Sequence, residues 1–560
     1  KHEEYTALAA QKHSIRLPIL ADRGLIFDRN GEILAANIPV RKVVIDGSLV
    51  KNPNALAEVA APILELPEEQ LRKELTTTSK YKVLVPELAE EKAIALRKAM
   101  VERNLRGLFF YESSIRTYPN GPMLSHVLGF LARKDPKDEH VVGVDGVERT
   151  MEAHLCGEDG FRHIERDRTG REIVIYRGQE QAAQNGRNIE LTIDMGLQAI
   201  LETELENAFR DLKPETATGI IVDPKTGEIL AMSNRPSFDL NAINAAKPEE
   251  MKNRAILDMV EPGSTFKIVA ASGALNEKVV NEKTTIYCEN GSFAYGGRIL
   301  RDHHGYGQMT VHEILLKSSN IGSAKLAMLT GDEKFYEYVR RFGFGERTGI
   351  DLPGEIPGLV HPPARWDKLT ITRMPMGHAV AVTPLQITMA MSVIANGGKL
   401  MRPHIIRSIK DQEGNELQRL EPEVVRQVIP ENIAKYVSNA LAEVVSERGT
   451  ASLAKVNGFT VAGKTGTAQK VDPKGGYTPG KYVVSFVGYM PVEDPQFVCL
   501  IIIDDAKISS GLNYGGLVAA PIFSRVAEKA ARYLDLTPAQ RAEPILPVAM
   551  RQAPEIEYRQ

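Results

Sequence analysis

The chain has 560 residues and a formal net charge of −3, from 69 basic and 72 acidic side chains. This length exceeds one ordinary hydrophobic core and indicates several domain-sized units, while the balanced charge gives no electrostatic case for binding nucleic acid. Three widely spaced cysteines without a CxxC pair argue against a disulfide framework and against a structural zinc site; they are Cys156, Cys288 and Cys499.

The first part of the chain, residues 1–187, predicts a mixed unit of strands and helices. Apolar residues alternate over residues 21–35 around an Asp-Arg-Asn-Gly turn at Asp28 to Gly31, which predicts a β-hairpin with a type I′ Asn-Gly turn. Residues 41–112 then predict a small α/β insertion. Its expected elements are a strand at 43–45 and amphipathic helices at 54–64, 67–75 and 88–101.

A stretch rich in Gln, Gly and Asn at residues 178–187 predicts a domain boundary, and residues 188–536 predict a larger second unit. An antiparallel sheet covered by helices is an α+β fold. Residues 537–560 contain Pro and charge without periodicity, so we expect this tail to lie outside the core. The elements expected in the second unit are a helix at 196–210, a hairpin at 216–233, strands at 459–468, 482–490 and 496–504, and a closing helix at 521–534.

The strongest chemical signal in the chain is Ser264-Thr265-Phe266-Lys267, which follows a Pro-Gly breaker and leads into an apolar run. A helix starting here places Ser264 and Lys267 on one face. A serine hydroxyl needs a neighbouring base, and a lysine serves as one when burial and nearby cations lower its pKa. Ser-x-x-Lys alone is weak evidence, because it recurs at Ser48/Lys51, Ser79/Lys82 and Ser452/Lys455, to which we assign no role.

Two further motifs follow in order. Ser318-Ser319-Asn320 combines a hydroxyl that can relay a proton with an amide that can hold a peptide group. Lys464-Thr465-Gly466-Thr467 predicts a strand of small residues beside which a peptide can lie. A second Lys-Thr-Gly, at Lys225, lies between two β-rich runs and predicts only a hairpin turn. The segment 469–481 predicts a loop beside the third motif, either a gate over the cleft or a plain hairpin.

In this order, Ser264-x-x-Lys267, Ser318-x-Asn320 and Lys464-Thr465-Gly466 match the signature of the penicillin-recognising serine acyltransferases. Ser-Ser-Asn stands where class A β-lactamases usually show Ser-Asp-Asn. The resemblance spans the second half of the chain and implies an α+β penicillin-binding transpeptidase domain.

The first half resembles the elongated N-terminal pedestal, or dimerisation-type domain, of class B penicillin-binding proteins. Three motifs carry this likeness: Arg23-Gly24, Arg116-x-Tyr118-Pro119 and Gly143-x-x-Gly146-x-Glu148. Segments around the catalytic motifs resemble the division-type, FtsI-like branch of that family. These segments are Glu261-Pro262-Gly263-Ser264, 342–355, 377–386, 396–398 and 462–469.

The resemblance implies that the protein is a peptidoglycan D,D-transpeptidase. Ser264 would attack the carbonyl of the penultimate D-Ala of a stem peptide, and Lys267 would take its proton. Ser318, bridged to Lys464, would relay a proton to the departing D-Ala, while Asn320 holds the donor amide. An amine from a neighbouring stem peptide would then resolve the acyl-enzyme and form the cross-link.

The resemblance also implies how the substrate is bound. The substrate-binding residues would be Thr465, Gly466 and Thr467. Thr465 and Thr467 would hold the terminal carboxylate, and the backbone N–H groups of Ser264 and Thr467 would form the oxyanion hole. β-Lactams, which mimic the donor, would acylate Ser264. The partners implied are a SEDS-family glycosyltransferase and other division proteins, in septal cell-wall synthesis. The location implied is the cytoplasmic membrane, with a single-pass anchor upstream of this chain and the catalytic domain on the periplasmic, extracytoplasmic side.

No cofactor and no metal is expected. Elongation-type members often carry metal ligands before the Ser-x-Asn motif, and four possible ligands lie there in this chain, but their spacing does not match that branch. They are Cys288, Asp302, His303 and His304.

Other assignments stay open on the sequence alone. An elongation-type transpeptidase would share the architecture, and a D,D-carboxypeptidase or β-lactamase would share the motifs but pass the acyl group to water. A β-lactam-binding sensor module would bind covalently without turnover. The long first unit is unexpected for a β-lactamase, and no signalling segment is recognisable in the chain.

Overall fold

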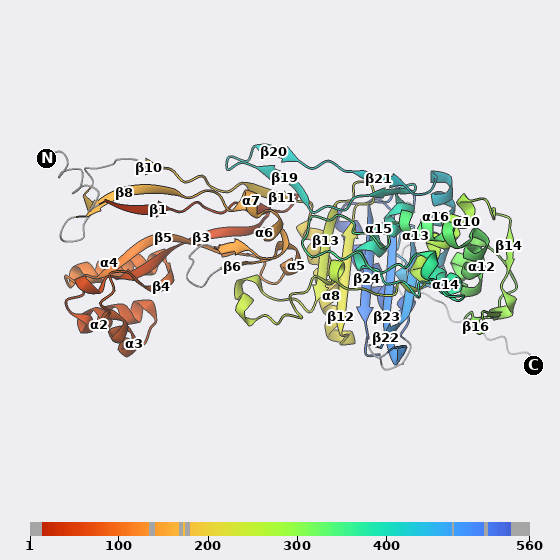
Figure 1. Ribbon diagram of the computed structural model, residues 1–560, viewed down its shortest axis with the longest axis horizontal. Helices are drawn as coiled ribbons and strands as arrows, with labels where there is room; N and C mark the ends of the chain where they lie inside the picture. Colours follow the sequence, from red (N-terminus) through yellow and green to blue (C-terminus); the bar gives the residue numbers. More distant parts are fainter. Residues whose placement is uncertain are drawn as a thin grey trace, which may run out of the picture.

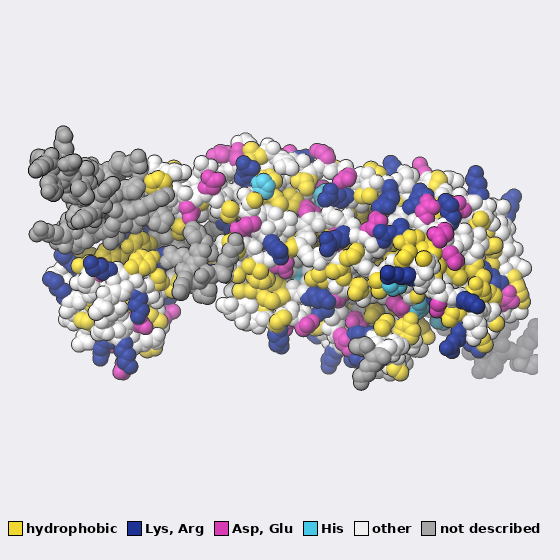
Figure 2. All heavy atoms as spheres, in the orientation of Figure 1, with side chains coloured by type: hydrophobic (Ala, Val, Ile, Leu, Met, Phe, Trp, Pro, Cys, Tyr) yellow, Lys and Arg dark blue, Asp and Glu magenta, His cyan; other side chains and the backbone are white. Residues whose placement is uncertain are grey.

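The computed structural model describes residues 14–133, 141–166, 172–173, 180–472, 475–508 and 513–538. Figure 1 shows an elongated molecule with a narrow N-terminal part at one end and a broader C-terminal part at the other. Charged side chains of both signs are interspersed over the face seen in Figure 2. Within the described residues, no helix combines the length and apolar character needed to cross a bilayer.

The narrow part is built from small sheets and short helices. Strand β8 pairs antiparallel with β1, β9 and β10, and β6 pairs with β7. The elements of this part are β1 (Ser14–Ile19), β6 (Leu131–Arg133), β7 (Val141–Gly143), β8 (Gly160–Arg166), β9 (Glu172–Ile173), β10 (Glu180–Gln181), α5 (Ser125–Leu128), α6 (Gly146–Thr150) and α7 (Glu152–Leu155).

The predicted insertion forms an α/β lobe with an apolar core of its own at the far end of the narrow part (Figure 1). Its long strand β3 pairs antiparallel with β4 and β5, and helices α2, α3 and α4 cover them. The predicted helices are confirmed, although the last one begins at Glu90, since the residues up to Ala89 complete β4. The bounds are β3 (Ile33–Ile45), β4 (Lys82–Ala89), β5 (Leu108–Thr117), α2 (Pro53–Leu64), α3 (Glu68–Leu75) and α4 (Glu90–Glu102).

The three pedestal motifs of the sequence meet around one buried carboxylate, that of Glu148. Arg23 Nε donates to Glu148 Oε2 at 2.6 Å, and Arg116 Nε donates to Glu148 Oε1 at 2.7 Å. The Tyr118 hydroxyl donates to the same carboxylate at 3.3 Å. Arg23 also pairs with Glu152 at 2.6 Å. Residues more than 100 positions apart in the sequence are therefore joined at one point.

A continuous sheet connects the two parts of the molecule. Strand β11 (Asn188–Leu191) pairs parallel with β2 (Ile26–Phe27) and antiparallel with β19 (Ile406–Lys410), which in turn pairs with β20 (Glu416–Arg419). The predicted division at residue 187 therefore lies beside a strand shared by both parts, and the chain passes from one to the other through a sheet.

The broad part is organised around a five-stranded antiparallel sheet with the order β13-β12-β24-β23-β22. Every residue of β13 is buried, so both faces of the sheet are covered. Helices α8 and α17 pack together as one covering pair, and α15 and α16 as another. The bounds are β12 (Thr216–Val222), β13 (Ile229–Arg235), β22 (Ala462–Val471), β23 (Tyr477–Met490), β24 (Phe497–Asp504), α8 (Met195–Leu212), α15 (Pro384–Ala395), α16 (Glu431–Val444) and α17 (Gly515–Tyr533).

A helical subdomain lies beside the edge strand β22, at the end of the molecule farthest from the lobe (Figure 1). Its helices carry the first two catalytic motifs. The remaining bounds are α9 (Arg254–Leu257), α10 (Lys267–Asn276), α11 (Val311–Lys317), α12 (Asn320–Thr330), α13 (Asp332–Arg341), α14 (Thr370–Arg373), β14 (Thr285–Tyr287), β15 (Ser292–Tyr295), β16 (Arg298–Arg301), β17 (Gln308–Thr310), β18 (Lys399–Met401) and β21 (Val424–Gln427).

The predicted type I′ turn is wrong. Gly31 has a φ of +87°, but Asn30 is not in the left-handed region that such a turn requires. Instead the buried carboxylate of Asp28 accepts from the backbone N–H groups of Asn30 and Glu32, each at 2.8 Å. It also accepts from Met195 N at 3.2 Å. The Asp28 side chain therefore closes its own turn, and the bond from Met195 joins that turn to the second half of the chain.

Two further boundaries differ from the sequence-based expectation. Helix α17 begins at Gly515, so the predicted start at Pro521 lies inside it. Strands β22 and β23 extend into the predicted loop 469–481, which leaves only a short connection after Val471. Residues 473–474 of that loop, and all but the first two of the predicted tail 537–560, lie outside the described residues.

Candidate active site

Ser264 lies on a short 3₁₀ turn, η3 (Gly263–Phe266), that continues into helix α10. The first turn is thus tighter than the predicted α-helix, yet it still brings Lys267 onto the same side as Ser264. Ser264 is partly exposed, whereas the side chain of Lys267 has no exposed surface. A partly exposed serine hydroxyl and a buried amine on the same turn are compatible with the predicted Ser-Lys pair, whose catalytic roles stay a prediction.

The ammonium of Lys267 is held by the second motif. Its Nζ donates to the backbone oxygen of Ser318 at 2.5 Å, to Ser318 Oγ at 3.1 Å and to Asn320 Oδ1 at 2.8 Å. Ser318 ends helix α11 with a φ of +57°, and Asn320 begins α12. The sharp break between the two helices therefore turns both side chains of the motif toward Lys267.

The third motif reaches the same hydroxyl from the opposite side. Lys464 Nζ donates to Ser318 Oγ at 3.0 Å, and its side chain is also fully buried. Ser318 Oγ thus lies between two lysine amines that come from a helix and from the edge strand of the sheet. Three segments separated by 51 and 146 positions converge on one oxygen.

Both lysines have depressed pKa values. Burial is the main cause of the lowered pKa of Lys267, and the charge of Lys464 lowers it further, while Asp302 opposes the change. Burial alone lowers the pKa of Lys464 to about 7. A buried ammonium loses hydration that few protein groups replace, so the neutral amine becomes accessible near neutral pH.

Strand β22 is an edge strand of the five-stranded sheet and runs alongside the serine turn. Gly466 has no room for a side chain, since a Cβ there would lie 2.3 Å from Ser485 Oγ and 2.8 Å from the backbone oxygen of Pro262. Thr465 Oγ1 lies 3.4 Å from Thr450 Oγ1, and Thr467 Oγ1 accepts from Gly515 N at 3.1 Å. All eight predicted site residues are thus gathered around η3 and β22.

Asp302 is a neighbour of the site whose role the sequence did not reveal. Its carboxylate accepts from Ser319 Oγ at 2.7 Å and from the backbone N–H groups of Asn320 at 2.5 Å and Ile321 at 3.1 Å. It therefore caps α12 from a separate loop and places a negative charge beside the Ser-x-Asn motif. The sequence offered it only as one of four possible metal ligands, because no spacing rule links it to the motif.

Those four residues do not form a ligand set in the structure. Among the described residues, no group of three or more His, Cys, Asp or Glu side chains is placed to hold a metal ion. The buried Cys288 thiol lies 3.6 Å from Ser319 Oγ, and burial raises its pKa. The exposed His303 instead packs its ring edge against Tyr514, with 6.3 Å between centroids.

The other Ser-x-x-Lys and Lys-Thr-Gly sequences of the chain, to which we assign no catalytic role, have different surroundings. Ser48 Oγ donates to Asp46 at 2.6 Å on the lobe, and Lys225 pairs with Asp494 at 2.6 Å in the β12–β13 turn.

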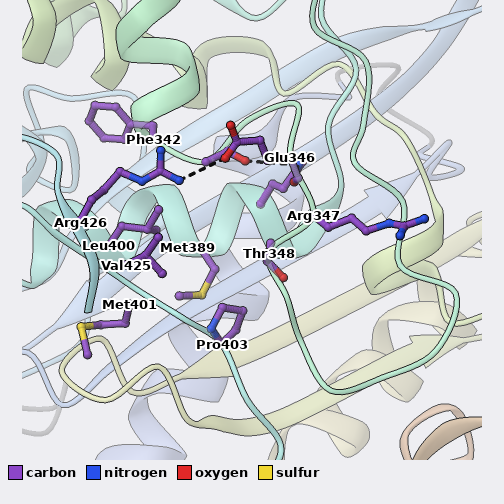
Figure 3. Close-up of a pocket in the computed structure, with 12 residues that line it drawn as sticks. Phe342, Glu346, Arg347, Thr348, Met389, Leu400, Met401, Pro403, Val425 and Arg426 are labelled. Carbon is purple, nitrogen blue, oxygen red and sulfur yellow. Dashed lines mark hydrogen bonds and ion pairs between the residues drawn. The ribbon is translucent and has the colours of Figure 1, made fainter. Parts of the chain in front are cut away.

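Figure 3 shows a pocket of about 40 Å³ whose rim carries an ion pair of 3.1 Å between Glu346 and Arg426. It has room for a few water molecules, and none of the predicted catalytic side chains lines it.

Comparison with known families identifies both halves of the chain. Residues 217–528, more than half of the sequence, match the penicillin binding protein transpeptidase domain, and residues 18–191 match the penicillin-binding protein dimerisation domain. Stage V sporulation protein D of Bacillus subtilis is 35% identical over 96% of this chain and 82% of its own length. Peptidoglycan D,D-transpeptidase FtsI of Escherichia coli K12 is 31% identical over 93% of this chain and 85% of its own length.

Solved structures agree with this assignment. Penicillin binding protein 2X of Streptococcus thermophilus superposes with a TM-score of 0.79 at 26% identity, over 92% of this chain and 80% of that one. Penicillin binding protein 3 of Mycobacterium tuberculosis, complexed with aztreonam, gives a TM-score of 0.71 at 27% identity, over 94% of this chain and 98% of that one. The chain therefore belongs to the class B penicillin-binding proteins, in which a dimerisation domain precedes a transpeptidase domain.

Proposed function

We propose that the residues gathered around Ser264 carry the peptidoglycan D,D-transpeptidase reaction of this class B penicillin-binding protein. Ser264 Oγ attacks the carbonyl carbon between the last two D-Ala residues of a donor stem peptide, and its proton passes to neutral Lys267. The bond to the terminal D-Ala breaks, and the leaving amine takes a proton through the hydroxyl of Ser318. An acceptor amine then attacks the ester, which returns the proton and frees Ser264.

The observation that carries this proposal is the Ser318 hydroxyl shared by two buried lysines. Hydrogen bonds of 3.1 Å from Lys267 and 3.0 Å from Lys464 form a continuous path for a proton between the nucleophile side and the substrate strand. Two buried lysines around one hydroxyl do not stabilise the fold, because their mutual repulsion and their lost hydration both oppose folding. A function in proton transfer explains the arrangement.

Strand β22 supports the binding part of the proposal. An extended peptide lying beside this edge strand would present its terminal carboxylate to Lys464, Thr465 and Thr467. The absence of a side chain at Gly466 lets the serine turn pack directly against the strand. Asn320 lies next to Lys267, where its side chain can hold the donor amide. β-Lactams that mimic this donor would stop at the acyl-enzyme, which makes the protein their target.

The cellular setting is a further proposal. The likeness to the division-type branch favours septal wall synthesis beside a SEDS-family glycosyltransferase, with an anchor in the cytoplasmic membrane and the catalytic domain outside. Mid-cell localisation of a fluorescent fusion to the full-length protein is the expected result. An even distribution along the lateral wall would instead favour the elongation-type setting.

The reaction is tested with a synthetic stem pentapeptide as donor and a stem peptide bearing a free amine as acceptor. Mass spectrometry should show a cross-linked product together with one equivalent of released D-Ala, and both should be absent with Ser264→Ala. Release of D-Ala without a cross-linked product, even at high acceptor concentration, would identify a carboxypeptidase instead.

A further inference from the structure

A polar cluster beside the serine turn joins three separate segments of the chain. We call it the Glu261 junction, and it consists of Glu261, His378, Ala379 and Tyr477. The Glu261 carboxylate lies 2.7 Å from His378 Nδ1 and accepts from Ala379 N at 3.1 Å. It also accepts from the Tyr477 hydroxyl at 3.1 Å. The Glu261 side chain is only 12% exposed, whereas Tyr477 lies at the surface.

The junction first ties the serine turn to the segment 377–382. Val260 and Val382 exchange backbone hydrogen bonds of 2.9 Å each, and Gly263 N donates to the backbone oxygen of Gly377 at 3.4 Å. Between these contacts, Ala379 adopts a φ of +58°, which is unfavourable for any residue with a side chain. The carboxylate of Glu261 binds the N–H of this strained residue and so holds the loop in place.

The junction also ties the serine turn to the substrate strand. Tyr477 begins β23 and pairs with Val471 of β22, four residues after Thr467. The serine turn also lies directly against β22, because a Cβ built on Gly263 would lie 3.1 Å from both the amide nitrogen and the carbonyl oxygen of Thr467. The backbone of Thr467 therefore faces the turn that carries Ser264, with no side chain between them.

We propose that Glu261 is a positioning residue that fixes the spacing between the backbone N–H groups of Ser264 and Thr467, the two donors of the oxyanion hole. This inference rests on the proposed function of Ser264 and Thr467. An oxyanion hole stabilises the transition state only when its donors are fixed before charge develops. Glu261 contributes by holding both backbones to a common point, three residues before the nucleophile.

The chemistry of the junction suits this task. Burial and the Glu261 charge raise the pKa of Tyr477 to about 12. The phenol therefore keeps its proton and remains a hydrogen-bond donor at neutral pH. A hydrogen bond to a carboxylate is shorter and stronger than one to a neutral oxygen. Glutamine at position 261 would keep the size of the side chain, but it would lose the charge and one of the two acceptor oxygens.

The test compares three variants of the catalytic chain, each acylated by a chromogenic β-lactam under single-turnover conditions. Glu261→Gln removes the charge, and Tyr477→Phe removes only the link to β23. Glu346→Gln is the matched control, because Glu346 also bonds two partners in this domain, Arg340 at 2.6 Å and Arg426 at 3.1 Å, outside the site (Figure 3). For each variant the acylation rate constant, the binding constant and the infrared stretch of the acyl-enzyme carbonyl are measured.

We expect Glu261→Gln to lower the acylation rate constant about tenfold to a hundredfold. Binding should change by less than about twofold, and the carbonyl stretch should move to higher wavenumber because its hydrogen bonds are weaker. Tyr477→Phe should change both quantities in the same direction by a smaller amount, and Glu346→Gln should change neither. A loss confined to binding, or an unmoved carbonyl band in both junction variants, would overturn the inference. No adduct on the unaltered protein would instead overturn the proposed function on which the inference rests.

Discussion

Lys464 has no exposed surface and no carboxylate partner among the described residues, yet it lies beside a second buried lysine. Burial of each amine destabilises the fold, and the proposed proton transfer explains why both are present. This destabilisation is electrostatic, so its magnitude in free energy depends on pH.

Replacing Lys464 by Met is therefore expected to stabilise the fold at neutral pH. The pKa of Lys464 is about 7 in the folded protein, against an ordinary value of 10.5. Between these values the unfolded chain binds the extra proton, so this lysine's contribution to stability improves by about 1.4 kcal/mol per pH unit as pH rises. The free-energy advantage of Lys464→Met should be largest at and below pH 7 and shrink toward pH 10. Thermal unfolding from pH 6 to 10 measures it, and a constant difference would contradict the pKa assignment.

Asp302 acts on the same chemistry through the Ser-x-Asn motif. Asp302→Asn keeps a side-chain oxygen but loses the charge that holds Asn320, and acylation by a β-lactam should slow about tenfold. The Asp302 charge raises the pKa of Lys267, so removing it should move the acidic limb of the rate profile to lower pH.

Asp194→Asn is the control for Asp302. Asp194 also caps a helix of this domain, accepting from Gly196 N at 3.0 Å and Leu197 N at 3.1 Å. The same chemical change there should leave both the rate and its pH profile unaltered. A slower Asp302→Asn variant with an unshifted profile would reduce Asp302 to a helix cap without electrostatic influence on Lys267.

At the scale of elements, the site depends on how closely the serine turn packs against segment 377–382. A Cβ on Gly377 would lie 2.2 Å from the backbone oxygen of Gly263. Gly377→Ala should therefore displace the turn and lower the acylation rate constant more than tenfold.

Gly331→Ala separates this contact from backbone strain. Gly331 also has a positive φ, +84° against +83° for Gly377, but its Cβ would meet nothing within 4 Å. Its ψ of +153° lies outside the left-handed region that Gly377 occupies with a ψ of +25°, so its backbone is at least as unfavourable for a side chain. Each variant should lose about 1 to 3 kcal/mol of stability from backbone strain, and Gly377→Ala should lose more through the clash with Gly263. Only Gly377→Ala should lose acylation, and equal acylation rates for the two would contradict the proposed packing.

Most elements could be predicted from the sequence, because their signals are local. Alternation and turn chemistry identified the β12–β13 hairpin and the return strands, and the three motifs identified the residues that converge on Ser318. Other features could not be predicted. The Asp28 carboxylate closes its own turn in competition with the type I′ form that Asn-Gly favours, and the role of Asp302 depends on a loop that folds back onto α12. The start of α17 depends on close packing of Gly515 against β22 and β23.

At the scale of the whole molecule, the catalytic part is joined to the narrow part by a shared sheet and not by a free linker. Strand β11 pairs on one side with β2 and on the other with β19. Within the narrow part, Glu148 is the point at which its three motifs meet, with no exposed side-chain surface of its own.

Glu148→Ala should destabilise the narrow part by about 3 to 5 kcal/mol, because it removes the carboxylate that pairs with Arg116 and leaves Arg23 with Glu152 alone. Calorimetry should show a lowered unfolding transition, while β-lactam acylation at low temperature remains. Glu58→Ala is the control, since its ion pair with Arg103 is 3.0 Å long but both side chains are more than half exposed. That variant should change stability by less than about 1 kcal/mol. Similar losses of stability in the two variants would contradict the importance of the contacts around Glu148.

The most direct test of the whole account is the intact mass of the protein after incubation with benzylpenicillin, followed by peptide mapping. We predict a single stable adduct of one drug molecule on the peptide that contains Ser264, and no adduct on Ser264→Ala. An adduct on another residue, or none on the unaltered protein, would contradict the assignment of Ser264 as the nucleophile.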